Sequence, residues 1–173
     1  FPDAQFDLGD GESIQVALGF LGLVGLLEIP LRILTIIFFL IWEYRAFNNL
    51  SALKARNLEY SPGWAVGWWF IPFANLVKPF QAMRELWNES DPEYDAESFL
   101  SVSAGAPLMM GFWWAFWLLS NFAHQIANKI DDLQFFPVAL ITASVLEIIA
   151  AGLLIKIILG IVERQELRHK NIG

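Results

Sequence analysis

The stretch IQVALGFLGLVGLLEIPLRILTIIFFLIW, residues 14–42, decides the fold of this chain. Only two of its side chains are charged. As an α-helix it would be about 43 Å long at a rise of 1.5 Å per residue, which exceeds the roughly 30 Å hydrocarbon core of a bilayer. A run this long and this apolar predicts a membrane-crossing helix that is tilted, or kinked at Pro30.

The composition of the whole chain indicates the same class of protein. Its 173 residues are 56% hydrophobic and 17% charged, where soluble domains have about 45–50% and about 25%. We therefore predict an all-α fold, a polytopic integral membrane helical bundle. The net charge is −7 and no basic stripe is interleaved with aromatic residues, which argues against nucleic acid as a partner. The absence of cysteine excludes disulfides and thiolate metal sites, and we expect no metal.

The apolar runs and polar stretches divide the chain into seven parts of one membrane domain, residues 1–173. We expect an acidic leader (1–13), a helix (14–47), a broken segment (62–87), an acidic loop (88–105), a second helix (106–128), a third helix (135–163) and a charged tail (164–173).

The segment PGWAVGWWFIPFANLV, residues 62–77, is short for a crossing and is interrupted by Pro72. If all four apolar segments crossed, the Lys and Arg residues outside them would divide four against five between the two sides. If the second segment enters and returns, they divide eight against one, in agreement with the concentration of basic residues on the cytoplasmic side. We therefore predict three crossings plus one Pro-broken re-entrant segment, with the C-terminus in the cytoplasm; four crossings are the alternative.

The run YSPGWAVGWWFIPFANLVKPFQAMRELW, residues 60–87, and the preceding FLIWEYRAFNNLSAL, residues 39–53, resemble the core of a bacterial membrane-protein family. That family is catalogued only as a domain of unknown function, so the resemblance implies an architecture in the bacterial cytoplasmic membrane and no catalytic residue. Members usually carry a further hydrophobic helix before the equivalent of residue 14, which we expect upstream of this chain. The motif positions include Trp42, Arg45, Asn49, Pro62, Gly63, Trp64, Arg84, Glu85 and Trp87.

Four charged residues lie inside the apolar runs, and we expect all of them except Lys156 to meet. Glu28 and Arg32 are spaced i and i+4 on one helix face, and Glu147 lies near the middle of the last helix. An unpaired charge at the centre of a bilayer costs about 2.5–3.5 kcal/mol on insertion scales, so such groups pair or face water. A buried network of these three residues is predicted, either as a proton or ion site or as a structural clasp.

The interruption of the second segment carries a motif of its own. Broken helices expose backbone groups that transporters use to bind substrates, and the residues at this break are Pro72, Asn75, Lys78 and Pro79. The alternative is structural: Asn75 satisfies carbonyls freed at the turn, while the Lys78 amine reaches the membrane surface.

His124 is a candidate cofactor ligand because it follows three tryptophans on the same predicted helix. A tetrapyrrole or quinone stacked on those rings is conceivable, but a histidine near a helix end is more often an interface residue, and we expect no cofactor.

The chain contains no reactive constellation that we recognise, so we do not expect an enzyme. Glycines at 19, 22 and 25 and many aromatic residues favour close helix packing. The predicted function is a non-catalytic accessory or scaffolding subunit whose partners are the lipid bilayer and other membrane-protein subunits. The alternatives are a small transporter or channel component that uses the Glu28–Arg32–Glu147 network, and a pigment- or haem-binding subunit.

Overall fold

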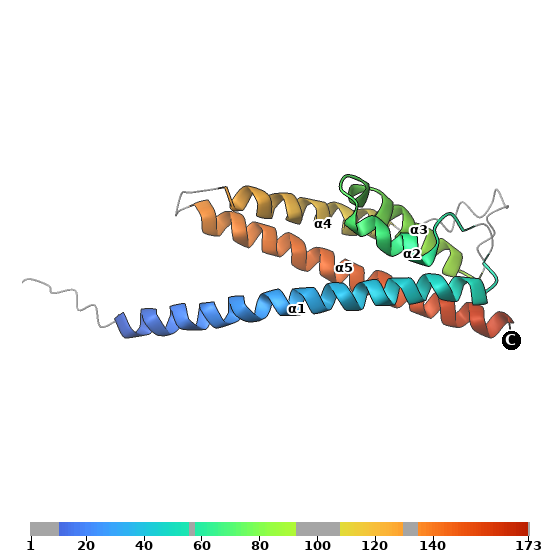
Figure 1. Cartoon of the computed structure of the whole chain (residues 1–173), viewed down its shortest axis with the longest axis horizontal. Coiled ribbons are helices and arrows are strands. Elements are labelled where there is room, and N and C mark those ends of the chain that lie inside the picture. The colour runs from blue at the N-terminus through green and yellow to red at the C-terminus, as the bar shows by residue number, and fades with distance from the viewer. Residues whose placement is uncertain (1–10, 56–57, 93–107, 130–134, 173) are drawn as a thin grey trace, which may run out of the picture. The chain divides into compact units, whose positions relative to one another are not determined.

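The computed structural model describes residues 11–55, 58–92, 108–129 and 135–172, and all regular structure in these ranges is helical (Figure 1). The α-helices are α1 (Gly11–Ala52), α2 (Pro62–Gly67), α3 (Lys78–Ser90), α4 (Leu108–Ala127) and α5 (Phe135–Ile172). Two 3₁₀ turns, η1 (Trp68–Phe70) and η2 (Ala74–Leu76), stand between α2 and α3. The all-α prediction is confirmed.

The chain forms two compact units, residues 1–42 and 43–173, and the boundary falls inside α1. In the first unit α1 continues through Pro30. The hydroxyl of Thr35 donates to the carbonyl of Leu31 at 2.8 Å, and the rings of Phe39 and Trp42 lie 5.9 Å apart.

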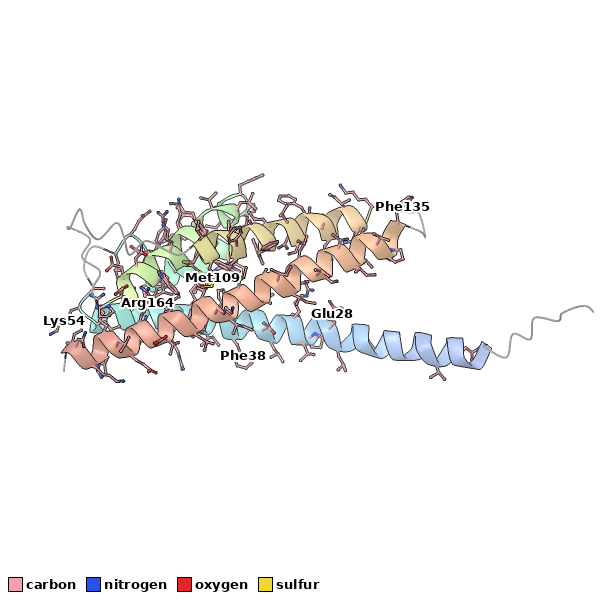
Figure 2. The ribbon with its side chains drawn as sticks, turned by 180° about the vertical axis from the view of Figure 1, so that it is seen from behind. Glu28, Phe38, Lys54, Met109, Phe135 and Arg164 are labelled. Atoms are coloured by element: carbon pink, nitrogen blue, oxygen red, sulfur yellow. The ribbon has the colours of Figure 1, made fainter. Side chains whose placement is uncertain are left out.

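In the second unit α4 and α5 lie side by side and antiparallel, and α3 packs against α5 (Figure 1). Phe135 and Arg164 mark the apolar beginning and the more polar end of α5 (Figure 2). Large, fully buried side chains come from the end of α1, from α3, from α4 and from α5: Phe47, Leu50, Met83, Leu86, Met110, Trp113, Ile157 and Ile161.

Two of the described helices are long and apolar enough to cross a membrane: the part Gly25–Ala52 of α1, and α5. Helix α4 has 20 residues, but Asn121, His124 and Gln125 make its last turns more polar. Helix α4 is therefore not among the described helices that are long and apolar enough to cross a membrane.

The segment after Ser61 is a broken helical hairpin rather than one helix. Ser61 caps α2 by accepting a hydrogen bond from the Trp64 backbone N–H at 3.4 Å, and Pro62 begins the helix. The chain turns at Ile71–Pro72–Phe73, where Phe73 has a φ of 65°, and α3 begins at Lys78. Proline lacks the amide N–H that a continuing helix needs, which explains why the helix ends before it.

The predicted boundaries need four corrections, and the first is that α1, expected to end at residue 47, continues to Ala52. Residues 164–172, expected as a charged tail, continue α5. Helix α3 extends through Ser90 into the expected acidic loop, and α1 begins at Gly11 within the expected leader. Each correction adds polar residues to the end of a helix that is already formed. Adding residues to a formed helix is easy, because the unfavourable step is the first turn. Residues 1–10 and 93–105 of the leader and loop lie outside the described part.

Candidate functional site

The end of α1, the end of α3 and the last turns of α5 meet in a set of polar contacts that we call the polar junction. At its centre is Gln165, which is 9% exposed. Its amide nitrogen donates to the carbonyl of Ala46 at 2.9 Å and to the Ser90 hydroxyl at 3.2 Å. Its amide oxygen accepts a hydrogen bond from Asn49 at 3.3 Å. One side chain of α5 therefore joins α1 to α3, and it uses the family-motif residue Asn49.

Arg168 completes the polar junction one turn further along α5. Its guanidinium donates to the carbonyl of Leu53 at 3.0 Å, to the carbonyl of Glu89, and to that of Asp91 at 3.3 Å. The last carbonyls of a helix have no partner within the helix, and a cation is favourable beside them. Arg168 thus binds the backbone at the ends of both α1 and α3.

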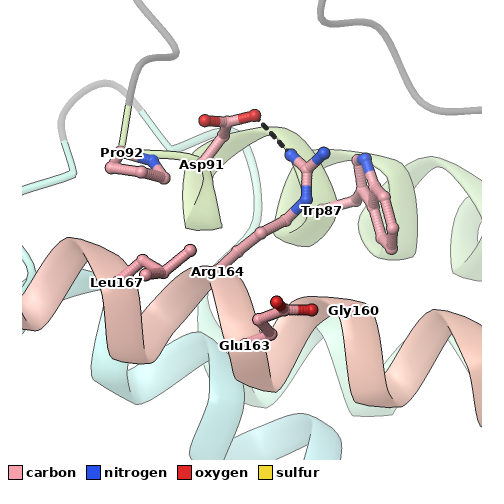
Figure 3. Close-up of a pocket in the computed structure, with 7 residues that line it drawn as sticks. All are labelled: Trp87, Asp91, Pro92, Gly160, Glu163, Arg164 and Leu167. Carbon is pink, nitrogen blue, oxygen red and sulfur yellow. Dashed lines mark hydrogen bonds and ion pairs between the residues drawn. The ribbon is translucent and has the colours of Figure 1, made fainter.

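Trp87 and Arg164 form the adjoining contact between α3 and α5 (Figure 3). The Arg164 guanidinium lies 4.2 Å from the centre of the Trp87 ring and pairs with Asp91. On the same face of α5, a β-carbon at Gly160 would lie 2.7 Å from the Trp87 ring. An open pocket of about 440 Å³ is lined here by Trp87, Asp91, Pro92, Gly160, Glu163, Arg164 and Leu167.

Glu85 and Lys78 connect α3 to the chain that precedes α2. The Glu85 carboxylate accepts hydrogen bonds from the backbone N–H groups of Glu59 and, at 3.1 Å, of Tyr60. The Lys78 amine donates to the Tyr60 hydroxyl at 3.1 Å, and that hydroxyl donates to Gln81 at 2.9 Å. Burial raises the pKa of Glu85, and the two backbone donors oppose this rise.

Burial also raises the pKa of Glu89, and the charge of Glu85 adds to the rise while that of Arg168 opposes it. In the folded protein these two carboxyls therefore hold their protons to higher pH than in the unfolded chain. Their contribution to stability is therefore complete below the usual glutamate range and declines as the pH rises through the raised pKa values.

The helix break packs against an aromatic cluster on α4. The rings of Trp114 and Trp117 are stacked at 4.8 Å, and Trp69 meets them edge-on at 5.9 and 5.6 Å. The indole N–H of Trp114 donates to the carbonyl of Leu76 at 3.0 Å. A tryptophan of α4 therefore satisfies a carbonyl at the break, whereas the sequence had suggested Asn75 for this role. The backbone N–H of Asn75 donates to Ile71 at 2.9 Å.

The remaining residues of the helix-break and family motifs lie as follows. Pro72 is in the turn between η1 and η2, and Pro79 is buried in the first turn of α3. Trp42 ends the first unit. Gly63 and Trp64 are in the first turn of α2, and Arg45 and Arg84 are exposed on α1 and α3.

The three residues of the predicted charge network lie in two pairs, one of which includes His124. Glu28 and Arg32 form an ion pair of 3.3 Å within α1 (Figure 2 labels Glu28). Glu147 of α5 lies 3.3 Å from His124 of α4. The first pair belongs to the unit 1–42 and the second to the unit 43–173, so the three-membered network stays a prediction. His124, the candidate cofactor ligand, has its Nε2 engaged with Glu147.

Sequence reasoning did not identify Glu43, which is buried on α1 and accepts a hydrogen bond from Trp69 at 2.9 Å. The signal for it was present. Glu43, Ala46, Phe47 and Leu50 follow the i, i+3, i+4, i+7 spacing of a buried helix face, so a glutamate heads an otherwise apolar stripe. Within the described ranges no group of three or more His, Asp or Glu side chains could hold a metal ion.

These observations define the class: an all-α protein with two helices able to span a membrane, held at one end by a polar junction. The family described as a domain of unknown function, DUF4328, matches residues 8–163, and the chain belongs to this family. No curated protein and no solved structure matches the chain.

Proposed function

We propose that this protein is a non-catalytic accessory or scaffolding subunit of a membrane protein complex. The observation that supports this function best is the use of its polar residues. Asn49, Glu85 and Trp87 of the family motif contact other helices or backbone of their own unit. Such contacts stabilise one arrangement of helices, which is what a subunit needs to present a constant surface to a partner.

The surface offered to a partner is the outer face of α5. Ile141, Ile148, Ile155 and Leu159 are 64%, 70%, 57% and 61% exposed and recur at spacings of seven, seven and four residues. In a bilayer this stripe faces lipid or the apolar face of another helix. Packing between membrane helices depends on van der Waals fit and small residues, and Gly152 and Ala151 lie beside the stripe.

Purification in mild detergent from the native membrane tests this function. We expect a second membrane protein at fixed stoichiometry, and photo-crosslinking from Ile148 and Ile155 should capture it. Crosslinking from Leu53, which is buried at the end of α1, is the control and should give no such product. Recovery of the chain alone, with ion flux when it is reconstituted in vesicles, would replace the scaffold by a transporter or channel component. Coloured protein would replace it by a pigment- or haem-binding subunit.

The proposed topology has three crossings, α1, α4 and α5, and a re-entrant segment formed by α2, η1, η2 and α3. Two facts support the re-entrant part: the break at Pro72, and the exposure of large apolar side chains there, with Phe70 at 69% and Phe73 at 86%. Side chains of this kind are favourable in lipid and unfavourable in water. With this topology the basic residues outside the apolar runs divide eight to one, which supports a C-terminus in the cytoplasm of a bacterial cell.

Cysteine labelling tests this topology, because the chain contains no cysteine. Single cysteines at Ser51, Ala96 and Lys170 should react with a membrane-impermeant reagent only from the cytoplasmic side, and a cysteine at Lys129 only from the outside. If Ala96 reacts from the outside and Ser51 from the cytoplasm, the second segment crosses and the four-crossing alternative is correct.

A second candidate function, a proton- or ion-conducting component, has its own support. Glu28, Arg32 and Glu147 lie in apolar helices, where charged residues often mark ion pathways. It predicts flux from the isolated protein and loss of that flux in Glu147→Gln, whereas the scaffold predicts none in either.

A further inference from the structure

Glu43 is the most completely buried acidic residue described in the second unit, at 0% exposed. Its Oε2 accepts a hydrogen bond from the indole N–H of Trp69 at 2.9 Å. Its Oε1 is buried, and among the described residues nothing donates to it. One oxygen is therefore satisfied by a neutral donor, and the other is buried without a donor among the described residues.

The basic groups of the elements around Glu43 are engaged elsewhere. On α3, Lys78 contacts Tyr60 and Glu59. On α4, His124 contacts Glu147, and on α5 Arg164 pairs with Asp91.

Arg84 of α3 and Lys156, His169 and Lys170 of α5 are exposed. Arg168 of α5 donates to backbone carbonyls, and Arg45, two residues beyond Glu43 on α1, is exposed. Among the described residues, the donor that contacts the Glu43 carboxyl is the indole N–H of Trp69.

A carboxylate in such a place loses its hydration without gaining a counter-charge, and the usual outcome in proteins is that the group takes up a proton instead. We propose that Glu43 is a proton-binding site, in which the proton is carried on Oε1 while Oε2 accepts the Trp69 hydrogen bond. The ligand is the proton itself. This site lies where the end of α1 meets the helix break and is independent of the pairs Glu28–Arg32 and His124–Glu147.

Release of that proton would place an uncompensated charge against η1. Trp69 holds η1 to α1 through the Glu43 hydrogen bond and to α4 through its edge-on contacts with Trp114 and Trp117. Water would have to enter to solvate Oε1, while the charged carboxylate would accept the Trp69 hydrogen bond more strongly at Oε2. The protonation state of Glu43 is therefore coupled to the hydration of the contact between α1 and η1.

Infrared spectroscopy of the whole chain in detergent tests the proton directly. At neutral pH the wild type should show the carbonyl band of a buried carboxylic acid, and this band should move in heavy water. Glu43→Gln should lack it. Glu166→Gln, an exposed glutamate on α5, is the matched control and should keep it. A wild-type spectrum without this band, or a band of unchanged intensity in Glu43→Gln, would overturn the proposal.

Two further measurements keep the proposal testable if Glu43→Gln folds poorly. Trp69→Phe removes the indole donor, so the carboxylic acid band should move to the higher frequency of a free carbonyl; an unmoved band would contradict the assignment. The folded wild type holds a proton on Glu43 that the unfolded chain releases, in addition to the protons of Glu85 and Glu89, so its thermal stability should fall more steeply above the usual glutamate range than that of Glu43→Gln. A stability that instead rises with sodium concentration at constant pH would show that the site binds a cation.

Discussion

Replacing Gly160 with alanine should weaken the attachment of α3 to α5. The new β-carbon would lie 2.7 Å from two ring atoms of Trp87, a distance that requires the ring or a helix to move. Trp87 is 7% exposed and has the Arg164 guanidinium 4.2 Å from its ring centre, so the ring has little room. Overpacking of a buried contact costs about 1–3 kcal/mol. We expect a net loss of about 1–2 kcal/mol in the free energy of unfolding, measured by denaturation in detergent.

Gly152 provides the matched control on the same helix, because a β-carbon there meets no atom within 4 Å. Alanine stabilises a helix by about 1 kcal/mol relative to glycine, so Gly152→Ala should be neutral or stabilising. The two substitutions should therefore change the free energy of unfolding in opposite directions. The effect of the Trp87 contact is thereby distinguished from the effect of helix propensity. Equal effects at the two positions would show that the Trp87 contact contributes nothing to stability.

The elements of this fold were predictable because their signals are local. The apolar run 14–42 indicates a long helix from its length and composition alone, and Pro72 indicates where a second helix must end because proline has no amide donor. Both signals are contained in the residues themselves and need no knowledge of their neighbours.

The pairing of polar side chains was much less predictable, because it depends on how helices are turned towards each other. Depth in the apolar runs predicts a network of Glu28, Arg32 and Glu147, which stays a prediction, but depth gave no indication of His124 because it does not say which way a side chain points around its helix. Glu147 lies beside His124, which precedes it by 23 residues in the α4–α5 hairpin. Asn49 and Gln165 are 116 residues apart, and no short-range pattern predicts such a contact.

The polar end of α5 could have been predicted by following one helix face further. Ile157 and Ile161 are buried, and the next positions at helical spacing are Gln165 and Arg168. The high charge of residues 163–170 suggested a solvated tail. The buried face of α5 instead continues at helical spacing into this polar part. There the amide of Gln165 and the guanidinium of Arg168 take the positions that apolar side chains hold earlier in the helix.

Replacing Arg168 with alanine should have the largest effect of the changes considered. It removes donors from the carbonyls of Leu53, Glu89 and Asp91, which follow or end α1 and α3. Hydrogen bonds that involve a charged group contribute about 1.5–3 kcal/mol each, and partial exposure of this site reduces their sum. We expect a loss of about 3 kcal/mol in the free energy of unfolding, together with faster amide hydrogen exchange in the last turns of α1 and α3.

Two companion variants show whether geometry or charge is responsible. Lys170→Ala removes the same charge from an exposed position two residues away and should leave stability nearly unchanged. Arg168→Lys keeps the charge but replaces the planar, multiply donating guanidinium with a single ammonium, so it should recover less than half of the loss. If Arg168→Lys restored the full stability, the positive charge alone would stabilise the helix ends, and the hydrogen-bond geometry of the guanidinium would contribute nothing. A result for Arg168→Ala equal to that for Lys170→Ala would mean that the polar junction does not hold α1 to α3, and the scaffold function would lose its structural basis.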